Sequence, residues 1–232
     1  MRDPLSKIIP IKHEGLHQTV VNRLRAAIVE GKIAPGSRLS ERALCEQMGV
    51  SRTPMREAFK VLAGENLIHI LPNKGAVLPL MSVEEIIHTF EVIASLEGLS
   101  GLLAAQRATP AQLQKIQKLQ ADMESAHQRK NLPRYYSLNS EIHSLIAEAA
   151  HNPVLKETYL TINSRLQALR FRSNLNQSKW DKAVREHAQI AKALLKRDGD
   201  KLAELLVAHL KAKSDIVVGL LKNEPSKDRR SK

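Results

Sequence analysis

The chain has 232 residues, which is enough for one large or two modest domains, and its single cysteine excludes an intramolecular disulfide framework. Its formal net charge of +12 predicts attraction to polyanions such as nucleic acid, although ribosomal and membrane-surface proteins share this property. The N-terminal residues lack the long apolar core of a signal peptide, and we see no run that approaches the roughly 20 apolar residues of a membrane span. We therefore expect a cytoplasmic protein without a membrane partner.

Residues 38–66 have the pattern of a helix-turn-helix. Ser40 is placed to cap a first short helix, and Gly49 gives the turn between the helices its conformational freedom. Pro54 suits the first turn of a second helix, capped by Ser51 or Thr53. The apolar stripe expected on the second helix consists of Met55, Ala58, Phe59 and Leu62. We expect Cys45, on the first helix, to be a core residue.

The exposed N-terminal half of the second helix is the part that would meet base edges in a major groove. The candidates there are Ser51, Arg52, Thr53 and Arg56, and Arg38 and Arg42 flank them at positions suited to phosphate contacts. An ordinary helical hairpin with a solvated basic face, or an RNA-binding use, would be the alternatives. DNA binding is favoured because three features occur at the spacing of a helix-turn-helix. They are the small residue at the helix contact, the glycine in the turn and the Ser-Arg-Thr start of the second helix.

The residues that follow predict a β-hairpin wing. Residues 67–71 are rich in strand formers, residues 72–75 form a turn, and residues 76–78 return. The wing would bring Asn73, Lys74 and Gly75 to a neighbouring groove or phosphate. Upstream, an amphipathic helix is indicated by Leu16, Val20, Leu24 and Ile28. Together, the upstream helix, the helix-turn-helix and the β-hairpin predict a winged helix-turn-helix domain over residues 1–80.

The run PGSRLSERALCEQMGVSRTPMREAFKVLAGENLI, closed by LPNKGAVL, resembles the DNA-binding domain of the GntR family of bacterial transcription regulators over about residues 10–80. The resemblance implies contacts from Arg42, Arg52 and Arg56 to phosphates and guanine edges. It also implies that Ser51, Thr53 and Pro54 line the base-reading surface, and that Gly75 touches the minor groove.

From residue 81 the sequence takes on a helical period and predicts a second, all-α domain over residues 81–222, followed by a solvated basic tail over 223–232. The fold class is therefore mainly α, with a winged helix followed by a bundle of about six helices. The expected helices span about 82–107, 109–130, 132–150, 152–172, 179–197 and 199–222.

Two histidines lie inside apolar helical stripes and are expected to point inward. His187 stands three residues from Val184, and His209 stands three from Leu206. Each histidine is eleven residues from Asp198. If the two helices fold back on each other at that residue, both imidazoles lie at one level, about 16 Å from the turn along the helix axes.

A second pair, Asn139 and His143, lies one helical turn apart at the edge of an earlier stripe. Three imidazoles and an amide oxygen in an apolar bundle form a plausible site for a divalent metal such as Zn²⁺ or Ni²⁺. A lone buried histidine is more often a hydrogen-bonded core residue, and this alternative stays open for each of them.

Residues 82–222 resemble the FCD effector domain of the FadR-type branch of the GntR family, in which an Asp-x-x-x-His helix and two later histidines hold a metal. Asn139 replaces that aspartate, which implies looser metal binding and a stronger Lewis acid. Ile93 stands where many FCD domains carry an effector-facing arginine. An anionic effector would then bind the metal or arginines on the fourth helix of this domain. The candidates are Arg165, Arg170 and Arg172.

The resemblance implies a metabolite-responsive transcription regulator, usually a repressor. Because one winged helix reads only about one major-groove segment, we expect a homodimer that binds a pseudo-palindromic DNA operator. We expect a small organic acid as the effector, because the metal would offer it a positive centre. The alternative is a metal-dependent hydrolase with an appended DNA-binding module. We do not favour an enzyme, because a hydrolytic zinc site keeps a carboxylate as general base, and Glu141 and Glu186 are predicted to lie off the inward stripes. Nonspecific nucleic-acid binding is a third possibility.

Overall fold

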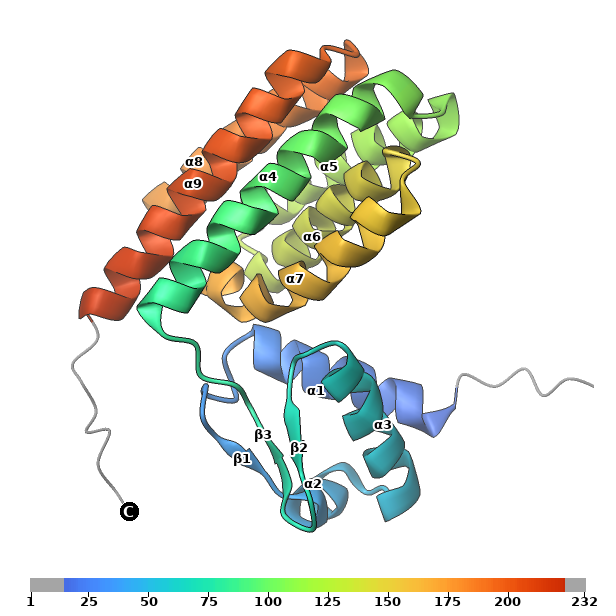
Figure 1. The fold of residues 1–232 in the computed structure, drawn as a ribbon, viewed down its shortest axis with the longest axis vertical. Coiled ribbons are helices and arrows are strands. Elements are labelled where there is room, and N and C mark those ends of the chain that lie inside the picture. Colours follow the sequence, from blue (N-terminus) through green and yellow to red (C-terminus); the bar gives the residue numbers. More distant parts are fainter. Residues whose placement is uncertain (1–14, 224–232) are drawn as a thin grey trace, which may run out of the picture.

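A computed structural model describes residues 15–223, which form a small mixed domain and a larger helical domain stacked on it (Figure 1). The expected basic tail lies outside the described residues except for Asn223. The small domain contains α1 (Leu16–Val29), β1 (Arg38–Leu39), α2 (Glu41–Met48), α3 (Arg52–Gly64), β2 (His69–Leu71) and β3 (Gly75–Val77).

The three strands form an antiparallel sheet in the order β1-β3-β2, with Arg38 opposite Val77 and Ile70 opposite Ala76. The sequence predicted the hairpin of β2 and β3. Strand β1 was not anticipated, because two residues are too short to show an alternating pattern. Its pairing joins the start of the helix-turn-helix to the wing and makes one unit of the two.

The local signals of the helix-turn-helix are confirmed. The Ser40 hydroxyl accepts a hydrogen bond from the Ala43 amide at the start of α2, and Gly49 ends α2 with a φ of 64°. Ser51 occupies the cap position of α3, although its side chain makes no capping hydrogen bond. The predicted stripe of α3 is fully buried. Cys45 is half-buried and packs against the same core.

One expectation for α1 is wrong. Leu16 is 56% exposed, whereas Val20, Leu24 and Ile28 are buried as predicted. Leu16 is the first residue of the helix, and Val21 takes part in the core instead. The core of the small domain thus lies between α1, α3 and the sheet.

The larger domain contains the six predicted helices. They are α4 (Val83–Arg107), α5 (Pro110–Gln128), α6 (Leu132–Ala149), α7 (Pro153–Arg172), α8 (Gln177–Leu195) and α9 (Gly199–Asn223). Ser82 and Thr109 form capping boxes, and the Asn131, Asn152 and Asn176 side chains cap the next three helices. Polar caps therefore fix most of the boundaries, and α8 begins two residues earlier than predicted.

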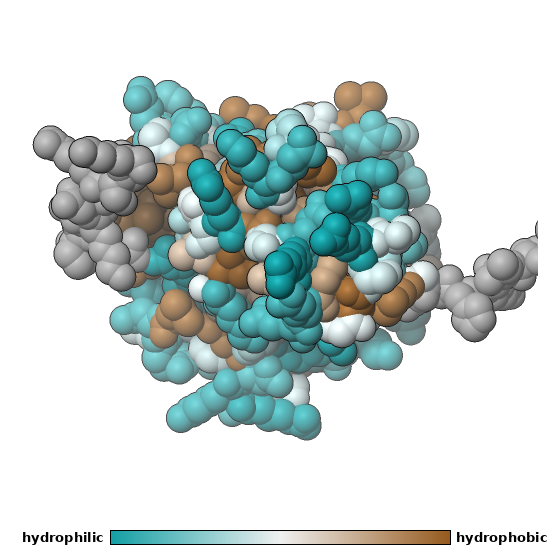
Figure 2. Space-filling view, turned by 90° about the horizontal axis from the view of Figure 1, so that it is seen from below, coloured by the Kyte–Doolittle hydropathy of each residue, from teal (hydrophilic) through white to brown (hydrophobic). Residues whose placement is uncertain are grey.

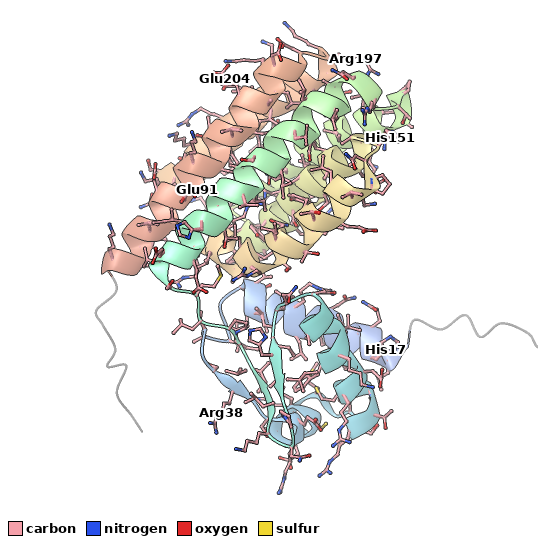
Figure 3. All side chains as sticks on the ribbon, viewed as in Figure 1. His17, Arg38, Glu91, His151, Arg197 and Glu204 are labelled. Atoms are coloured by element: carbon pink, nitrogen blue, oxygen red, sulfur yellow. The ribbon has the colours of Figure 1, made fainter. Side chains whose placement is uncertain are left out.

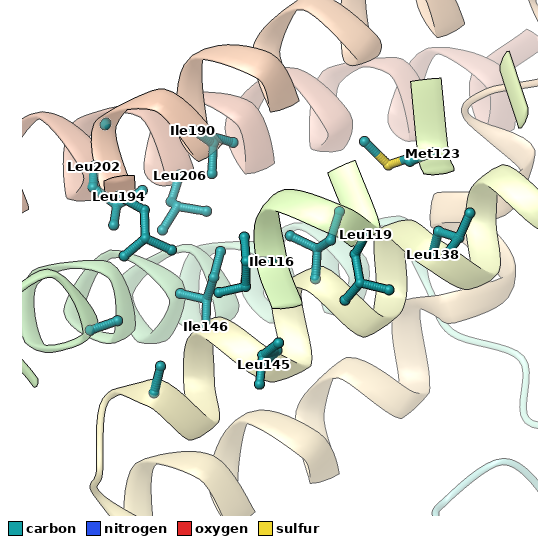
Figure 4. Packing of buried hydrophobic residues seen from close by; sticks show 14 of the residues in the cluster. Ile116, Leu119, Met123, Leu138, Leu145, Ile146, Ile190, Leu194, Leu202 and Leu206 are labelled. Carbon is teal, nitrogen blue, oxygen red and sulfur yellow. The ribbon is translucent and has the colours of Figure 1, made fainter. Parts of the chain in front are cut away.

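Apolar side chains from five of these helices form the main core of the bundle (Figure 4). Helix α4 lies along α9 in the largest helix-helix contact. Gly101 permits this approach, because a Cβ added there would lie 2.7 Å from a Leu206 methyl group. By length and composition alone α4 could cross a membrane, which the sequence reading had not anticipated. Half of its apolar window is buried inside the bundle, as for the core helix of a globular domain.

The two domains meet where α1 lies against α7 (Figure 1). Val29 at the end of α1 packs with Tyr136 of α6 and Phe171 of α7 in a small apolar cluster. The Tyr136 hydroxyl donates a 2.8 Å hydrogen bond to the Gln167 carbonyl oxygen and so ties α6 to α7 at this contact. The cluster makes a direct packing connection between the small domain and the bundle.

Candidate DNA-binding surface and metal centre

The N-terminal half of α3 forms the predicted reading surface. Ser51, Arg52, Thr53 and Arg56 are exposed, whereas Pro54 is half-buried. Figure 2 views the molecule from the end occupied by the winged helix, and hydrophilic side chains project across most of this face. The surface therefore has the polar, solvent-facing character that base and phosphate contacts require.

Two of the candidate arginines are held by acids of α2. The Arg56 Nε lies 2.9 Å from Glu41 Oε2, and the Arg42 Nε lies 2.9 Å from Glu46 Oε1. Such exposed ion pairs add little stability, but they restrain the guanidinium groups and leave other N–H donors available. The sequence reading named both arginines and did not foresee their acidic partners.

The wing tip depends on its glycine. Asn73 and Gly75 both have positive φ angles, 58° and 81°, and a Cβ added at Gly75 would lie 2.2 Å from the Leu39 carbonyl oxygen. No other residue fits that place without moving β1. Asn73 and Lys74 are exposed at the tip, and Arg38 points outward from β1 at the edge of the domain (Figure 3).

Inside the bundle, three helices bring His143, His187 and His209 together. Their rings are 4.9 Å apart for two of the pairs and 5.7 Å for the third, measured between centroids. One nitrogen from each ring lies within 4.8 Å of the others, and every ring is at most 2% exposed. The prediction that α8 and α9 place their histidines at one level is confirmed, and His143 of α6 joins them.

The hydrogen bonding of this cluster differs from that of ordinary core histidines. Neither ring nitrogen of His143 or His187 makes a hydrogen bond, nor does the Nε2 of His209. Buried polar atoms are normally paired, so these unpaired nitrogens need another partner. Burial also lowers the pKa of each imidazole well below its usual value, which keeps it neutral, as a metal ligand must be. The cluster therefore fits a metal ion bound by three imidazoles.

Two carboxylates stand behind the imidazoles, and the sequence reading missed or misplaced both. Glu97 of α4 is 2% exposed, and its Oε2 lies 2.7 Å from the His143 Nδ1, although not in hydrogen-bond geometry. Glu186 was expected to lie off the inward stripe, but its Oε2 is 2.7 Å from the His209 Nδ1. Carboxylates in this position orient a metal-ligating imidazole and raise its basicity. Burial raises the pKa of Glu97, and the Arg170 charge opposes this shift.

The three candidate effector arginines of α7 have different environments. Arg165 is exposed, Arg172 is half-buried beside the connection to α8, and Arg170 is 3% exposed. The Arg170 Nη1 lies 3.2 Å from Glu97 Oε1 and donates a 2.7 Å hydrogen bond to Asn163 Oδ1. Of the three, Arg170 is therefore the one that reaches the polar interior, and Glu97 already neutralises its charge.

Two positions where the chain departs from the FCD pattern are also in the interior. Asn139 is 5% exposed and lies one turn before His143 on the same buried face of α6. Ile93 is completely buried in the apolar cluster of α4, α7 and α9, one turn before Glu97. This position is therefore occupied by an apolar core residue and supplies no charge to the interior.

Another buried charge was missed by the sequence reading. Lys213 of α9 is 4% exposed and lies one turn after His209. Its signal was present, because it stands three residues after Leu210 and four before Val217, within the apolar stripe of that helix. Glu97 gave a similar signal as an acid in the apolar run VIASLEG.

Comparison with known proteins agrees with both domains. The family model of bacterial regulatory proteins of the gntR family matches residues 16–78, and the FCD domain model matches residues 88–212. The HTH-type transcriptional repressor RspR of Escherichia coli is 29% identical over 202 residues, which cover 87% of this chain and 89% of RspR. The galactonate operon transcriptional repressor of Escherichia coli is 28% identical, over 78% of this chain and 87% of its own length.

Among solved structures, McbR/YncC of Escherichia coli superposes with a TM-score of 0.78 over 90% of this chain and all of that one, at 21% identity, which supports the fold. These relatives are named as regulators and not as enzymes. The matches to both domains, together with the winged helix and the helical bundle, show that this chain is a DNA-binding transcription regulator of the GntR family, in the FadR-type branch with an FCD domain.

Proposed function

We propose that this regulator is a cytoplasmic repressor that binds a pseudo-palindromic operator as a homodimer and responds to a small carboxylate at a metal centre in the FCD domain. The observation that carries the metal-dependent part is the set of buried, unpaired imidazole nitrogens of His143, His187 and His209. A dimer follows from the size of the reading surface, because one winged helix reads only about one major-groove segment.

His143, His187 and His209 would hold a Zn²⁺ or Ni²⁺ ion, with the Asn139 oxygen as a fourth ligand. When bound, the ion supplies a positive centre at which an anionic oxygen can replace water. The three imidazoles and the amide are all neutral, so the ligand set leaves the ion its full charge. Glu186 holds His209 with its Nε2 free, because the Nδ1 of that ring is engaged.

A packing route from this site to the DNA-binding domain supports regulation. Arg170 contacts Glu97 beside the histidines, and the next residue, Phe171, packs against Val29 of α1. A ligand that shifts the end of α7 would therefore press on the helix that supports α3. Such a ligand changes operator affinity only to the extent that it favours one arrangement of the two DNA-binding domains of the dimer over another. Coupling free energies of this kind are typically about 1–3 kcal/mol.

The hydrolase alternative has no support from the arrangement of the acids. Glu186 is engaged by His209, and Glu97 by Arg170, so each has a positioning partner in place of a water molecule to activate. Both acids instead have the surroundings of groups that orient ligands and balance charge.

The test is a linkage experiment. DNA duplexes enriched from a random pool by the metal-loaded protein would be titrated by calorimetry with and without each of a panel of small carboxylic acids. We expect at least one acid to change duplex affinity about 5- to 150-fold, and the duplex to change the affinity of that acid by the same factor. Chelated protein should lose the response. Equal binding of scrambled duplexes at all salt concentrations would instead indicate nonspecific association.

A further inference from the structure

Lys213 is a buried cation in the interior of the FCD domain. Its side chain is only 4% exposed, and lysine is rarely buried to this degree unless it is paired with an acid. It lies on α9 four residues after His209, so the two side chains share one face of the helix. A lysine in such a position needs a partner that carries negative charge.

The protein itself supplies only a neutral partner. The Lys213 Nζ donates a hydrogen bond to the Asn174 Oδ1, and among the described residues no carboxylate oxygen lies within 4 Å of this nitrogen. The two nearby acids are engaged elsewhere, Glu97 by Arg170 and Glu186 by His209. Burial lowers the pKa of Lys213 to about 7, as expected for an ammonium that lacks a compensating charge.

Lys213 also faces the proposed metal centre. Four residues of helix separate Lys213 from His209 by about 6 Å along the axis. Because helical side chains lean toward the N-terminus, the lysine leans toward the turn that carries His209. A metal held by His209 and the Lys213 ammonium would therefore lie about one helical turn apart, a span comparable to the length of a short organic acid.

We propose that Lys213 is the second anion-binding group of the metal-dependent carboxylate site, an inference that rests on the function proposed above. The effector is then a dicarboxylate of three to five carbons, with one carboxylate at the metal and the other at the ammonium. Arg170 differs from Lys213 in that it already has an anionic partner, because its Nη1 lies 3.2 Å from Glu97 Oε1, although its Nη2 makes no hydrogen bond. Lys213 would thereby determine that dicarboxylates are preferred over monocarboxylates.

The connection between α7 and α8 contacts Lys213 through Asn174. Asn174 in this connection is buried against the lysine, whereas the neighbouring Leu175 and Asn176 line an open groove of about 410 Å³ together with Ile216 of α9. Replacing the Asn174 contact by a carboxylate would give Lys213 the charge-assisted hydrogen bond that it lacks.

The experiment compares matched pairs of acids on metal-loaded, full-length protein. Calorimetry would measure malonate, succinate and glutarate against propionate, butyrate and valerate, for the wild type and for Lys213→Met. We expect at least one dicarboxylate to bind the wild type at least tenfold more tightly than the monocarboxylate of equal length. Lys213→Met should abolish this preference, so that the ratio of dicarboxylate to monocarboxylate affinity falls to about one, while the protein still binds metal.

Two further variants separate binding from a structural role. Lys213→Arg retains the charge and should keep the preference, and Asn174→Ala removes the neutral partner and should keep it too. If Lys213→Met does not fold, Lys213→Gln takes its place. The inference is overturned if metal-loaded wild type binds none of the three dicarboxylates more tightly than its matched monocarboxylate, or if the preference survives in the Met or Gln variant. The proposed function fails separately, if chelated wild type binds the same acids as tightly as loaded protein.

Discussion

The two functional regions of this regulator are built in opposite ways. The proposed DNA-binding surface comes from one continuous stretch, residues 38–77, and its polar side chains lie on the outside of a compact apolar core. The proposed metal centre draws its groups from α4, α6, α7, α8 and α9 and places them inside the bundle. The surface site can therefore tolerate a change in a single side chain. The interior site depends on several buried groups whose charges and hydrogen bonds balance one another.

The largest expected effect is at the interior site. His187→Ala should remove most of the bound metal, because the ring is completely buried between His143 and His209 and no other side chain can replace it. The stabilisation by metal would be lost, which is roughly 2.7 kcal/mol at a metal concentration 100 times the Kd. Thermal unfolding with and without added Zn²⁺ measures this loss. The exposed His88→Ala is the control, and an equal loss in both variants would argue against a metal at the cluster.

A smaller effect is expected at the DNA-binding surface. Arg52→Ala should weaken binding to the preferred duplex by roughly 1–3 kcal/mol and relax base preference, if the exposed guanidinium group of Arg52 contacts a guanine edge. Binding to the preferred duplex and to its single-base variants measures both quantities. The exposed Arg165→Ala of the bundle controls for the loss of one positive charge. A uniform loss over all sequences would make Arg52 a phosphate contact.

At the interior site, one substitution is expected to tighten metal binding. Asn139→Asp adds a negative charge beside His143 and should tighten metal binding, on the order of tenfold or 1.4 kcal/mol. Competition with a chromogenic chelator measures the affinity. Asn163→Asp, on α7 beside Arg170, is the matched control because it adds the same charge elsewhere in the interior. An unchanged affinity in Asn139→Asp would remove the amide from the ligand set.

The smallest effect is expected where the two regions meet. Phe171→Ala removes a ring from the contact with Val29 and Tyr136 and should weaken the coupling between effector and operator by roughly 0.5–2 kcal/mol. Metal content and operator affinity without effector should change little. The measurement is operator affinity with and without the active acid. Exposed Leu175→Ala is the control, and undiminished coupling in Phe171→Ala would place the route elsewhere.

The comparison also explains what the sequence could predict. Ser40, Gly49 and the α3 stripe act within a few residues of one another, so local chemistry was enough to place the helix-turn-helix. His187 and His209 could be paired because one turn, near Asp198, sets the register of two long helices. Glu97 could not be assigned in the same way, because its partners His143 and Arg170 lie on helices far away in sequence. Glu186 faces His209 across that same turn, but its position beside the apolar stripe gave no sign that its side chain reaches the next helix. Such pairing depends on how the helices pack.

The metal content of protein purified without chelator and without a histidine tag tests the central claim most directly. We expect about one divalent ion per chain by elemental analysis. Chelation should lower the melting temperature, and re-addition of Zn²⁺ or Ni²⁺ should restore it. A fully folded preparation that contains no metal, and whose melting temperature does not respond to either ion, would contradict the account.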